Sequence, residues 1–316
     1  MKNTISLVVP VYDTPKKLEC FLDYLLNISP GSLYQLIVID DCSTISLESV
    51  FENFRNNSGI FSQIFFRHEV NRGRAATRNT GLKFATGEFV YFVDVDNCPR
   101  TDAFVSIIDY FSNKDVACVR GNVRCLEDNV NNSSYVKFFD NRYLGSRYTT
   151  KVELPFNYFA TDAMCIRKSV LDSVGPFDES FTKYGCEDEE IGCRIELLGL
   201  LFLFCPDSLF TDIDKPSLSR ESSRMVEYAE FSIPYLLAKH EGYSKRSLFS
   251  SLEYTPTIFS RLRRRLLLVI LNVNLARLLG WMLSRWDTNI CCVPKYLYYY
   301  VIATHYKIGF KNRHKT

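Results

Sequence analysis

The chain has 316 residues, of which 47% are hydrophobic and 23% charged, and its formal net charge is +2. This length suits one large α/β domain with a smaller appendage, and the composition is that of an ordinary folded protein. The near-neutral charge gives no reason to expect nucleic acid as a partner. Eleven cysteines at irregular spacing exclude a small disulfide-stapled scaffold and paired zinc ligands, so we expect reduced thiols.

Short apolar runs alternate with helical patterns in the first part of the chain. The expected strands are 5–9, 36–39, 64–66 and 89–93, and the expected helices are 16–26, 47–54 and 75–84. This alternation predicts an α/β fold with a mainly parallel, doubly wound sheet and helices on both faces. Right-handed crossovers bring the carboxyl ends of the strands to one edge, where open α/β sheets bind ligands.

The pattern is less regular after residue 100. We expect a polar loop over 129–134, a mixed strand-like segment over 156–166, a helix over 169–174, a helix over 191–198 and a strand over 200–204. After about residue 220 the chain becomes helical, basic and aromatic. The sequence therefore predicts an α/β domain over 1–220 and a helical C-terminal region over 221–316.

Two carboxylates, Asp94 and Asp96, directly follow the expected buried strand 89–93, with Val95 between them. Such a pair at the carboxyl edge of a sheet suits Mg²⁺ or Mn²⁺ bridging a diphosphate, because these cations prefer oxygen ligands and keep positions open for phosphate. Asp40 and Asp41 follow another strand and reach the same edge. A turn that merely favours Asp is the plainer interpretation of either pair.

Arg74 and Arg78 lie one helical turn apart on the same face, with Asn79 beside them. Either guanidinium can reach a diphosphate at the sheet edge, and an ordinary solvated helix face is the alternative. The sequence lacks a Walker loop here, and no dinucleotide-binding Gly-x-Gly-x-x-Gly fingerprint follows the first strand.

The acidic run 187–190 opens an expected helix. Negative charge at a helix N-terminus is favoured by the helix dipole, which gives the run a purely structural interpretation. A carboxylate in such a place can also act as a general base, and the preceding Gly185 allows close approach of the backbone to a substrate.

Five motifs, in this order, resemble family 2 glycosyltransferases of the GT-A fold. They are Val9-Pro10-Val11-Tyr12, Ile39-Asp40-Asp41-Cys42-Ser43, Asn71-Arg72-Gly73 with Arg78-Asn79-Thr80-Gly81, Asp94-Val95-Asp96, and Gly185-Cys186-Glu187-Asp188. The resemblance covers about residues 4–215. Segment 184–190 is similar to galactosyl- and N-acetylgalactosaminyl-transferase domains, including those of bacterial capsule polymerases.

The resemblance implies an inverting, metal-dependent transfer of a hexose or N-acetylhexosamine from a UDP-sugar to a glycan or lipid-linked acceptor, in cell-surface polysaccharide synthesis. It implies that Asp188 is the catalytic base, that Glu187 positions the acceptor and that Asp96 binds Mn²⁺ or Mg²⁺. The implied nucleotide-sugar site comprises Pro10, Val11, Tyr12, Asp41, Arg74, Arg78, Asn79, Asp94 and Val95.

One position departs from the family pattern. Many relatives carry a histidine after the last strand that completes the metal site, and the matching position here is Asp212. A carboxylate can replace imidazole for Mg²⁺ or Mn²⁺. The alternative is that Asp212 caps a loop and that Asp96 alone holds the metal.

Two other functions compete with this interpretation. A catalytically inactive sugar-nucleotide-binding module is the first alternative, which the presence of both Asp96 and Asp188 disfavours. A nucleotidyltransferase is the second. It is disfavoured because residues 10–13 stand where its Gly-rich, basic phosphate loop would follow the first strand.

The C-terminal region combines basic and apolar residues. A basic run over 261–265 precedes the apolar stretch 266–283, which Asn272, Asn274 and Arg277 interrupt. These interruptions argue against a membrane span but permit a helix in the membrane interface. A helical bundle that completes the core or forms an oligomer interface is the alternative. With no signal-peptide pattern, we expect a cytoplasmic protein with room for peripheral contact with the inner face of the cell membrane.

Overall fold

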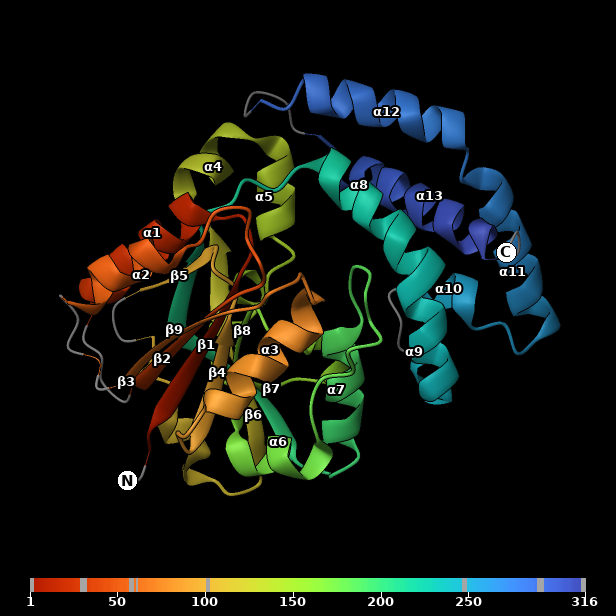
Figure 1. Ribbon diagram of the computed structural model, residues 1–316. Coiled ribbons are helices and arrows are strands. Elements are labelled where there is room, and N and C mark those ends of the chain that lie inside the picture. Colours follow the sequence, from red (N-terminus) through yellow and green to blue (C-terminus); the bar gives the residue numbers. More distant parts are fainter. Residues whose placement is uncertain are drawn as a thin grey trace. The chain divides into compact units, whose positions relative to one another are not determined.

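The computed structural model describes residues 3–28, 33–56, 60, 62–100, 103–245, 249–288 and 293–313. Two compact units are distinguished by their internal packing (Figure 1). The α/β unit contains 1–126, 141–182 and 187–214, and the helical unit contains 127–140, 183–186 and 215–316. Two short segments from the middle of the chain thus pack with the C-terminal residues, an arrangement that a single boundary at residue 220 does not include.

One nine-stranded sheet forms the centre of the α/β unit within the described residues. Its strands are β1 (Ile5–Val11), β2 (Leu33–Asp40), β3 (Ser62–Arg67), β4 (Phe89–Val93), β5 (Asn97–Pro99), β6 (Val116–Cys125), β7 (Val152–Glu153), β8 (Ala163–Arg167) and β9 (Leu201–Asp212). The spatial order is β3-β2-β1-β4-β8-β6-β9-β5, with β7 paired to β9.

Strands β1 to β4 are parallel to one another, as are β6 and β9. Strand β8 is antiparallel to β4 and β6, and the short β5 and β7 are antiparallel to β9. The predicted α/β class with a mainly parallel sheet is confirmed, and the antiparallel strands are an addition to it.

Helices of the α/β unit are α1 (Pro15–Leu26), α2 (Glu48–Arg55), α3 (Gly73–Phe84), α6 (Lys168–Val174) and α7 (Glu187–Glu196). Those of the helical unit are α4 (Glu127–Asn132), α5 (Ser134–Asp140), α8 (Leu218–Glu227), α9 (Ile233–Lys239), α10 (Ser250–Glu253), α11 (Ile258–Ile270), α12 (Val273–Arg285) and α13 (Lys295–Asn312). Short segments of other helix types occur at η1 (Ile108–Ser112), η2 (Leu144–Ser146), η3 (Phe156–Tyr158), η4 (Tyr228–Ser232) and η5 (Glu241–Lys245).

Alternating residues of the strands supply two separate cores. Helices α1 and α2 cover one face of the sheet, and α3, α6 and α7 cover the other (Figure 1). Leu7 and Val9 of β1 pack in the core that includes residues of α1 and α2, whereas Val8 packs in the core that includes residues of α3, α6 and α7. The strands are buried on both faces, which explains why they appear in the sequence as uninterrupted apolar runs. The carboxyl ends of the buried strands β1, β2 and β4 lie at one edge of the sheet.

Two local expectations differ from the structure. Helix α4 occupies most of the region where a polar loop over 129–134 was expected, and Glu127 and Asp128 in its first turn are favoured by the helix dipole. Strand β9 extends well beyond residue 204, to Asp212. Its pairing with β6 shifts register near Pro206, because proline cannot donate a ladder hydrogen bond and is tolerated at such an irregularity.

No single helix within the described residues is long and apolar enough to cross a bilayer. Helices α11 and α12, bent by 58° at their junction, meet the length and composition requirement only when taken together. The nine cysteines that fall in the described part of the chain are all free thiols.

Candidate active site

The candidate site lies where β1, β2 and β4 end. These strands are parallel neighbours, so Tyr12, Asp41 and Asp94, which follow them directly, share the carboxyl edge of the sheet. The juxtaposition expected from the sequence is therefore present.

Arg78 is the centre of a buried cluster of carboxylates. Its side chain is only 3% exposed; Nη2 lies 3.0 Å from Asp94 Oδ1, and Nη1 lies 3.1 Å from Glu187 Oε1 and 3.7 Å from Asp188 Oδ1. One guanidinium thus joins the Asp94 turn to the acidic start of α7. The guanidinium is thus surrounded by three protein carboxylates, and its contact with a nucleotide sugar stays a prediction.

Asp188 is oriented by a second set of contacts. Thr161 Oγ1 donates a hydrogen bond to Asp188 Oδ1 at 2.6 Å, and the Thr161 backbone N–H lies 3.3 Å from Oδ2. The side chain keeps 19% of its surface exposed, whereas that of Glu187 keeps 4%. Of the two acidic residues, Asp188 is the one whose carboxylate is both oriented and accessible.

Burial changes the acidity of this cluster. Desolvation raises the pKa of Glu187, the charge of Asp188 adds to the rise, and Arg78 opposes it. Desolvation likewise raises the pKa of Asp94 to about 6, with Arg78 opposing and Asp96 adding. Carboxyl groups with raised pKa values in contact with a specific cation are characteristic of functional sites.

The Asp94–Asp96 turn is held by the strand next to β4. The Asp162 carbonyl, just before β8, accepts hydrogen bonds from Asp94 N at 3.2 Å and Asn97 Nδ2 at 2.9 Å. The Asp162 carboxylate in turn accepts two hydrogen bonds from Arg120 Nη2, at 2.7 and 2.8 Å. The antiparallel strand β8 therefore fixes the geometry of the paired aspartates.

Two carboxylates converge on one cationic group at this edge. Lys17 Nζ, from α1, lies 3.3 Å from Asp96 Oδ2 and 3.1 Å from Asp214 Oδ2. Partial burial acts to lower the pKa of Lys17, but the two carboxylates raise it above its usual value. The described residues contain no ready-made group of three or more metal-ligating side chains; the carboxylates at this edge are arranged around an ammonium group instead.

Asp212 has a defined structural role. Its Oδ1 accepts from Asp214 N at 2.9 Å, and its Oδ2 accepts from the Tyr143 hydroxyl at 2.9 Å. Desolvation raises the pKa of Asp212 to about 7, and Asp96 contributes to the rise. These contacts fit the loop-capping alternative, while direct metal contact by Asp212 stays a prediction.

Asp41 caps the start of α3. Its Oδ1 accepts from Arg72 N at 2.9 Å and lies 2.7 Å from His68 Nδ1, and its Oδ2 accepts from Gly73 N at 2.8 Å. Gly73 has a φ of +83°, which a residue with a side chain rarely adopts. Both oxygens of Asp41 are therefore engaged within the fold, and its contact with uracil or ribose stays a prediction.

The other predicted residues divide into buried and accessible positions. Val11 and Val95 pack in the core of the α/β unit, so only their backbone groups are available to a ligand. Tyr12 is 49% exposed at the end of β1, and Arg74 is exposed at the first turn of α3. Pro10, the last but one residue of β1, is partly exposed.

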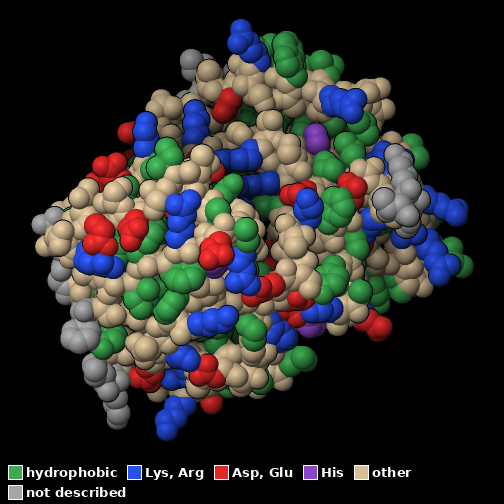
Figure 2. All heavy atoms as spheres, viewed as in Figure 1, with side chains coloured by type: hydrophobic (Ala, Val, Ile, Leu, Met, Phe, Trp, Pro, Cys, Tyr) green, Lys and Arg blue, Asp and Glu red, His purple; other side chains and the backbone are tan. Residues whose placement is uncertain are grey.

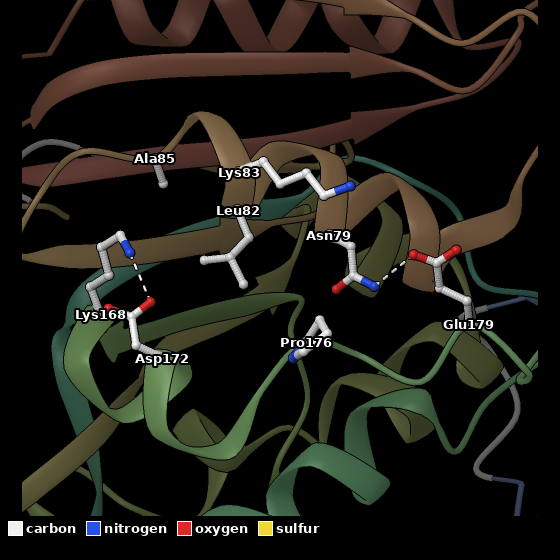
Figure 3. Close-up of a pocket in the computed structure, with 8 residues that line it drawn as sticks. All are labelled: Asn79, Leu82, Lys83, Ala85, Lys168, Asp172, Pro176 and Glu179. Atoms are coloured by element: carbon white, nitrogen blue, oxygen red, sulfur yellow. Dashed lines mark hydrogen bonds and ion pairs between the residues drawn. The ribbon is translucent and has the colours of Figure 1, made fainter.

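Asn79 forms hydrogen bonds with the segment before α7. Its Nδ2 donates to the Phe177 carbonyl and to Glu179 Oε1, both at 2.9 Å, and its Oδ1 accepts from Phe177 N at 2.8 Å. Asn79 also lines a cleft of about 450 Å³ between α3 and α6, together with Pro176 and Glu179 (Figure 3). This cleft includes none of the carboxylates at the sheet edge, so it does not mark the candidate site.

Several residues that shape the site were not predicted from the sequence. Thr161, Asp162 and Arg120 belong to no sequence motif, and they lie at the site only because β8 is inserted next to β4. Lys17 occupies an ordinary position in an amphipathic helix. Asp214 was within reach of the sequence, because it stands two residues after Asp212 in an acidic loop.

With this geometry established, comparisons with known proteins identify the family. The model of "Glycosyl transferase family 2" matches residues 6–175, more than half of the chain. The chain belongs to glycosyl transferase family 2. Chondroitin synthase of Escherichia coli is 23% identical to this family 2 chain over 281 residues, which cover 77% of the chain but 40% of that protein. The chain therefore spans less than half the length of this relative.

Solved structures support the same fold. The mannosyltransferase PcManGT from Pyrobaculum calidifontis, in complex with GDP-Man and Mn²⁺, has a TM-score of 0.58 at 18% identity, covering 96% of this chain and 86% of that one. Staphylococcus aureus TarS 1–349, in complex with UDP-GlcNAc, has a TM-score of 0.56 at 17% identity, covering 99% and 92%. At these identities the likeness concerns the fold, which is GT-A-like.

Proposed function

We propose that this family 2 chain is an inverting glycosyltransferase that uses a UDP-sugar. It transfers a hexose or N-acetylhexosamine to a hydroxyl of a glycan or lipid-linked acceptor, in the synthesis of a cell-surface polysaccharide. The observation that carries the proposal is the convergence of Asp94, Glu187 and Asp188 on the buried Arg78 at the carboxyl edge of the sheet. This cluster links the candidate donor turn to the candidate base.

Asp188 is the base in this mechanism. Its carboxylate takes the proton of the acceptor hydroxyl while that oxygen bonds to the anomeric carbon, and the bond from this carbon to the diphosphate breaks, releasing UDP. Thr161 keeps the carboxylate oriented through its 2.6 Å hydrogen bond. A single displacement needs no covalent enzyme intermediate and inverts the anomeric configuration.

Glu187 and Arg78 support this step without needing to touch the sugar. Both side chains are nearly fully buried and paired with each other. We assign them to positioning Asp188 and Asp94, and direct contact of Glu187 with an acceptor is not required. The exposed Arg74, one turn before Arg78, is the guanidinium better placed to meet the diphosphate.

The residues present fit a divalent cation. Asp96 and Asp214 already share one cationic partner, the Lys17 ammonium, and carboxylate oxygens are the ligands that Mn²⁺ and Mg²⁺ prefer. Asp96 and Asp214 would hold the ion, with Asp212 beside them. When bound, the ion would neutralise charge on the leaving diphosphate. Two structural neighbours, PcManGT with GDP-Man and GalNAc-T7 with UDP and GalNAc, contain Mn²⁺.

The proposal is tested by measuring nucleotide release from a panel of UDP-hexoses and UDP-N-acetylhexosamines, with GDP-mannose included. Each donor is incubated with Mn²⁺, Mg²⁺ or EDTA. We expect metal-dependent release of UDP from one donor, lost in Asp96→Ala and retained in the control Asp172→Ala, which removes an exposed carboxylate of α6.

Other outcomes distinguish the alternatives. Release of GDP but not UDP would overturn the donor assignment. Tight binding of a UDP-sugar without turnover, in the presence of glycan and lipid-linked acceptor pools, would favour the inactive binding module. Pyrophosphate formation from a nucleoside triphosphate and a sugar phosphate would favour a nucleotidyltransferase.

A further inference from the structure

Helices α11 and α12 present an unusual surface within the helical unit. Six large apolar side chains of α11 are more than half exposed: Ile258, Phe259, Leu262, Leu266, Val269 and Ile270. No residue of α11 is buried, and in α12 only Ala276 is. The two helices therefore leave most of their apolar surface outside the core, and a contiguous patch of this kind usually serves an interaction.

The six side chains of α11 lie on one side of the helix. At 3.6 residues per turn they fall within an arc of about 120°, and the basic side chains Arg263 and Arg265 flank this arc on its two edges. Leu267 and Leu268 lie outside the arc and pack against Tyr306 and Phe310. Helix α11 thus packs on its own unit through a small apolar side, while its larger apolar face is exposed.

The charge of this segment has one sign. Residues 258–286 contain six arginines, at 261, 263, 264, 265, 277 and 285, and no Asp, Glu or Lys. Figure 2 shows basic and hydrophobic side chains close together along the margins formed by α11 and α12. An apolar face bordered by guanidinium groups complements a surface that is apolar inside and anionic outside, which is the description of a bilayer with acidic headgroups.

The bend between the helices is anchored, so the outward face is fixed. Lys307 Nζ of α13 donates to the Leu268 carbonyl at 2.6 Å and to that of Leu271. The Tyr300 hydroxyl, also of α13, accepts from Asn272 N at 2.8 Å and donates to the Ile270 carbonyl at 3.0 Å. These contacts join the end of α11 and the start of α12 to the interior of the helical unit.

We propose that α11 and α12 form a docking surface for an anionic lipid bilayer and lie in its interface. The six apolar side chains of α11 and Trp281 of α12 enter the region of the headgroups and upper acyl chains, and the arginines meet lipid phosphates. This proposal extends the expectation of peripheral contact with the inner face of the cell membrane. It does not depend on the proposed transfer reaction.

The chain offers a direct probe of this surface. It contains two tryptophans, Trp281 and Trp286, which are 64% and 57% exposed at α12 and its C-terminal cap. Tryptophan emission of the full chain is recorded with vesicles of phosphatidylcholine alone and with vesicles in which about a third of the lipid is phosphatidylglycerol. We expect a blue shift with the anionic vesicles only, reversed by about 1 M salt, because screening weakens the arginine contacts.

The depth of the tryptophans in the bilayer is measured by fluorescence quenching with brominated lipids. Bromine atoms high on the acyl chain should quench the emission more than bromine atoms near its end, since helices in the interface do not reach the bilayer centre. Stronger quenching by the deep bromines would overturn the interfacial position and favour insertion of the bent pair.

Matched variants separate the apolar and the charged contributions. Leu262→Ser with Val269→Ser, and Arg263→Gln with Arg265→Gln, should each weaken partitioning, the arginine pair about thirtyfold at roughly a factor of five or more per charge. Leu197→Ser, a control at an exposed apolar residue outside these helices, should bind as the wild type does. Unchanged binding of both double variants would refute the proposal.

A blue shift that needs no lipid but grows with protein concentration would assign the surface to a second copy of the chain. Flotation with the same vesicles gives an independent measure of binding. Unfolded variants are recognised by loss of the far-ultraviolet circular dichroism of the wild type, so each result counts for or against the lipid surface.

Discussion

Removal of Arg78 should damage the α/β unit in a way that depends on pH. In Arg78→Met, the carboxylates of Asp94, Glu187 and Asp188 lose the guanidinium that lies 3.0, 3.1 and 3.7 Å away. Breaking a buried ion pair by removing one partner costs about 3–5 kcal/mol of unfolding free energy, because the remaining charge stays desolvated. We expect a loss of this size at pH 8.

The loss should be smaller at pH 5.5. Arg78 opposes the rise in the pKa values of Asp94 and Glu187, so both values rise further above their unfolded values in the variant. Such groups bind protons more tightly in the folded state, and they contribute stability that is present at low pH and lost as the pH rises through the folded pKa. Protonation therefore relieves part of the damage in acid.

Urea unfolding followed by far-ultraviolet circular dichroism, at pH 5.5 and pH 8, measures this difference. The control is Arg72→Met at the start of α3, where Arg72 and Glu179 form an ion pair of 3.1 Å with both side chains more than 40% exposed. We expect the control to lose less than about 1 kcal/mol. If Arg78→Met loses less than about 1 kcal/mol of unfolding free energy at pH 8, or if the loss is independent of pH, Arg78 is not the buried partner of these carboxylates.

Three further substitutions test other parts of the site. Lys17→Met should raise the affinity for Mn²⁺ at least about tenfold, because it removes a cation that competes for the same carboxylates. Electron paramagnetic resonance of free Mn²⁺ measures this affinity. An unchanged affinity, or an equal gain in the control Lys16→Met, would contradict the prediction. Desolvation and the neighbouring Asp96 raise the pKa of Asp212 to about 7, which costs the metal-free fold up to about 4 kcal/mol as the pH rises from 4 to 7. Asp212→Asn should therefore flatten the pH dependence of unfolding in EDTA, and an unflattened curve would argue against that cost. Thr161→Val should slow transfer about tenfold without changing donor affinity, because Asp188 loses its oriented hydrogen bond; a loss of donor affinity instead would move Thr161 to the donor site.

The sequence predicted the parallel part of the fold well, because strands β1, β2 and β4 are buried on both faces and appear as uninterrupted apolar runs. It also predicted that Asp41 and Asp94 lie at the same edge of the sheet, since parallel strands bring their carboxyl ends together. Asp94 and Glu187 are 93 positions apart in the sequence, and only the family resemblance implied that they belong to one site.

The sequence did not predict contacts that depend on strands whose place in the sheet differs from their order along the chain. The hydrogen bond from Thr161 to Asp188 forms because β8 pairs antiparallel with β4. The hydrophobic periodicity of the sequence does not predict that pairing. The helical spacing of α3 predicted that Arg74 and Arg78 can reach a diphosphate, and the family resemblance added Asn79 to the nucleotide-sugar site. In the structure Arg78 and Asn79 are both buried and bind protein groups, which their sequence neighbours do not reveal, and their contact with a ligand stays a prediction.

We propose that Asp188 performs the chemistry while other groups bind the donor. The most direct measurement compares Asp188→Asn with the wild type in two experiments on the same preparation: calorimetric titration with the UDP-sugar that the wild type hydrolyses, and UDP release with water as the acceptor. For Asp188→Asn we expect an unchanged Kd and a release rate lower by about a thousandfold, as follows from the loss of a general base. A release rate within tenfold of the wild type would contradict it.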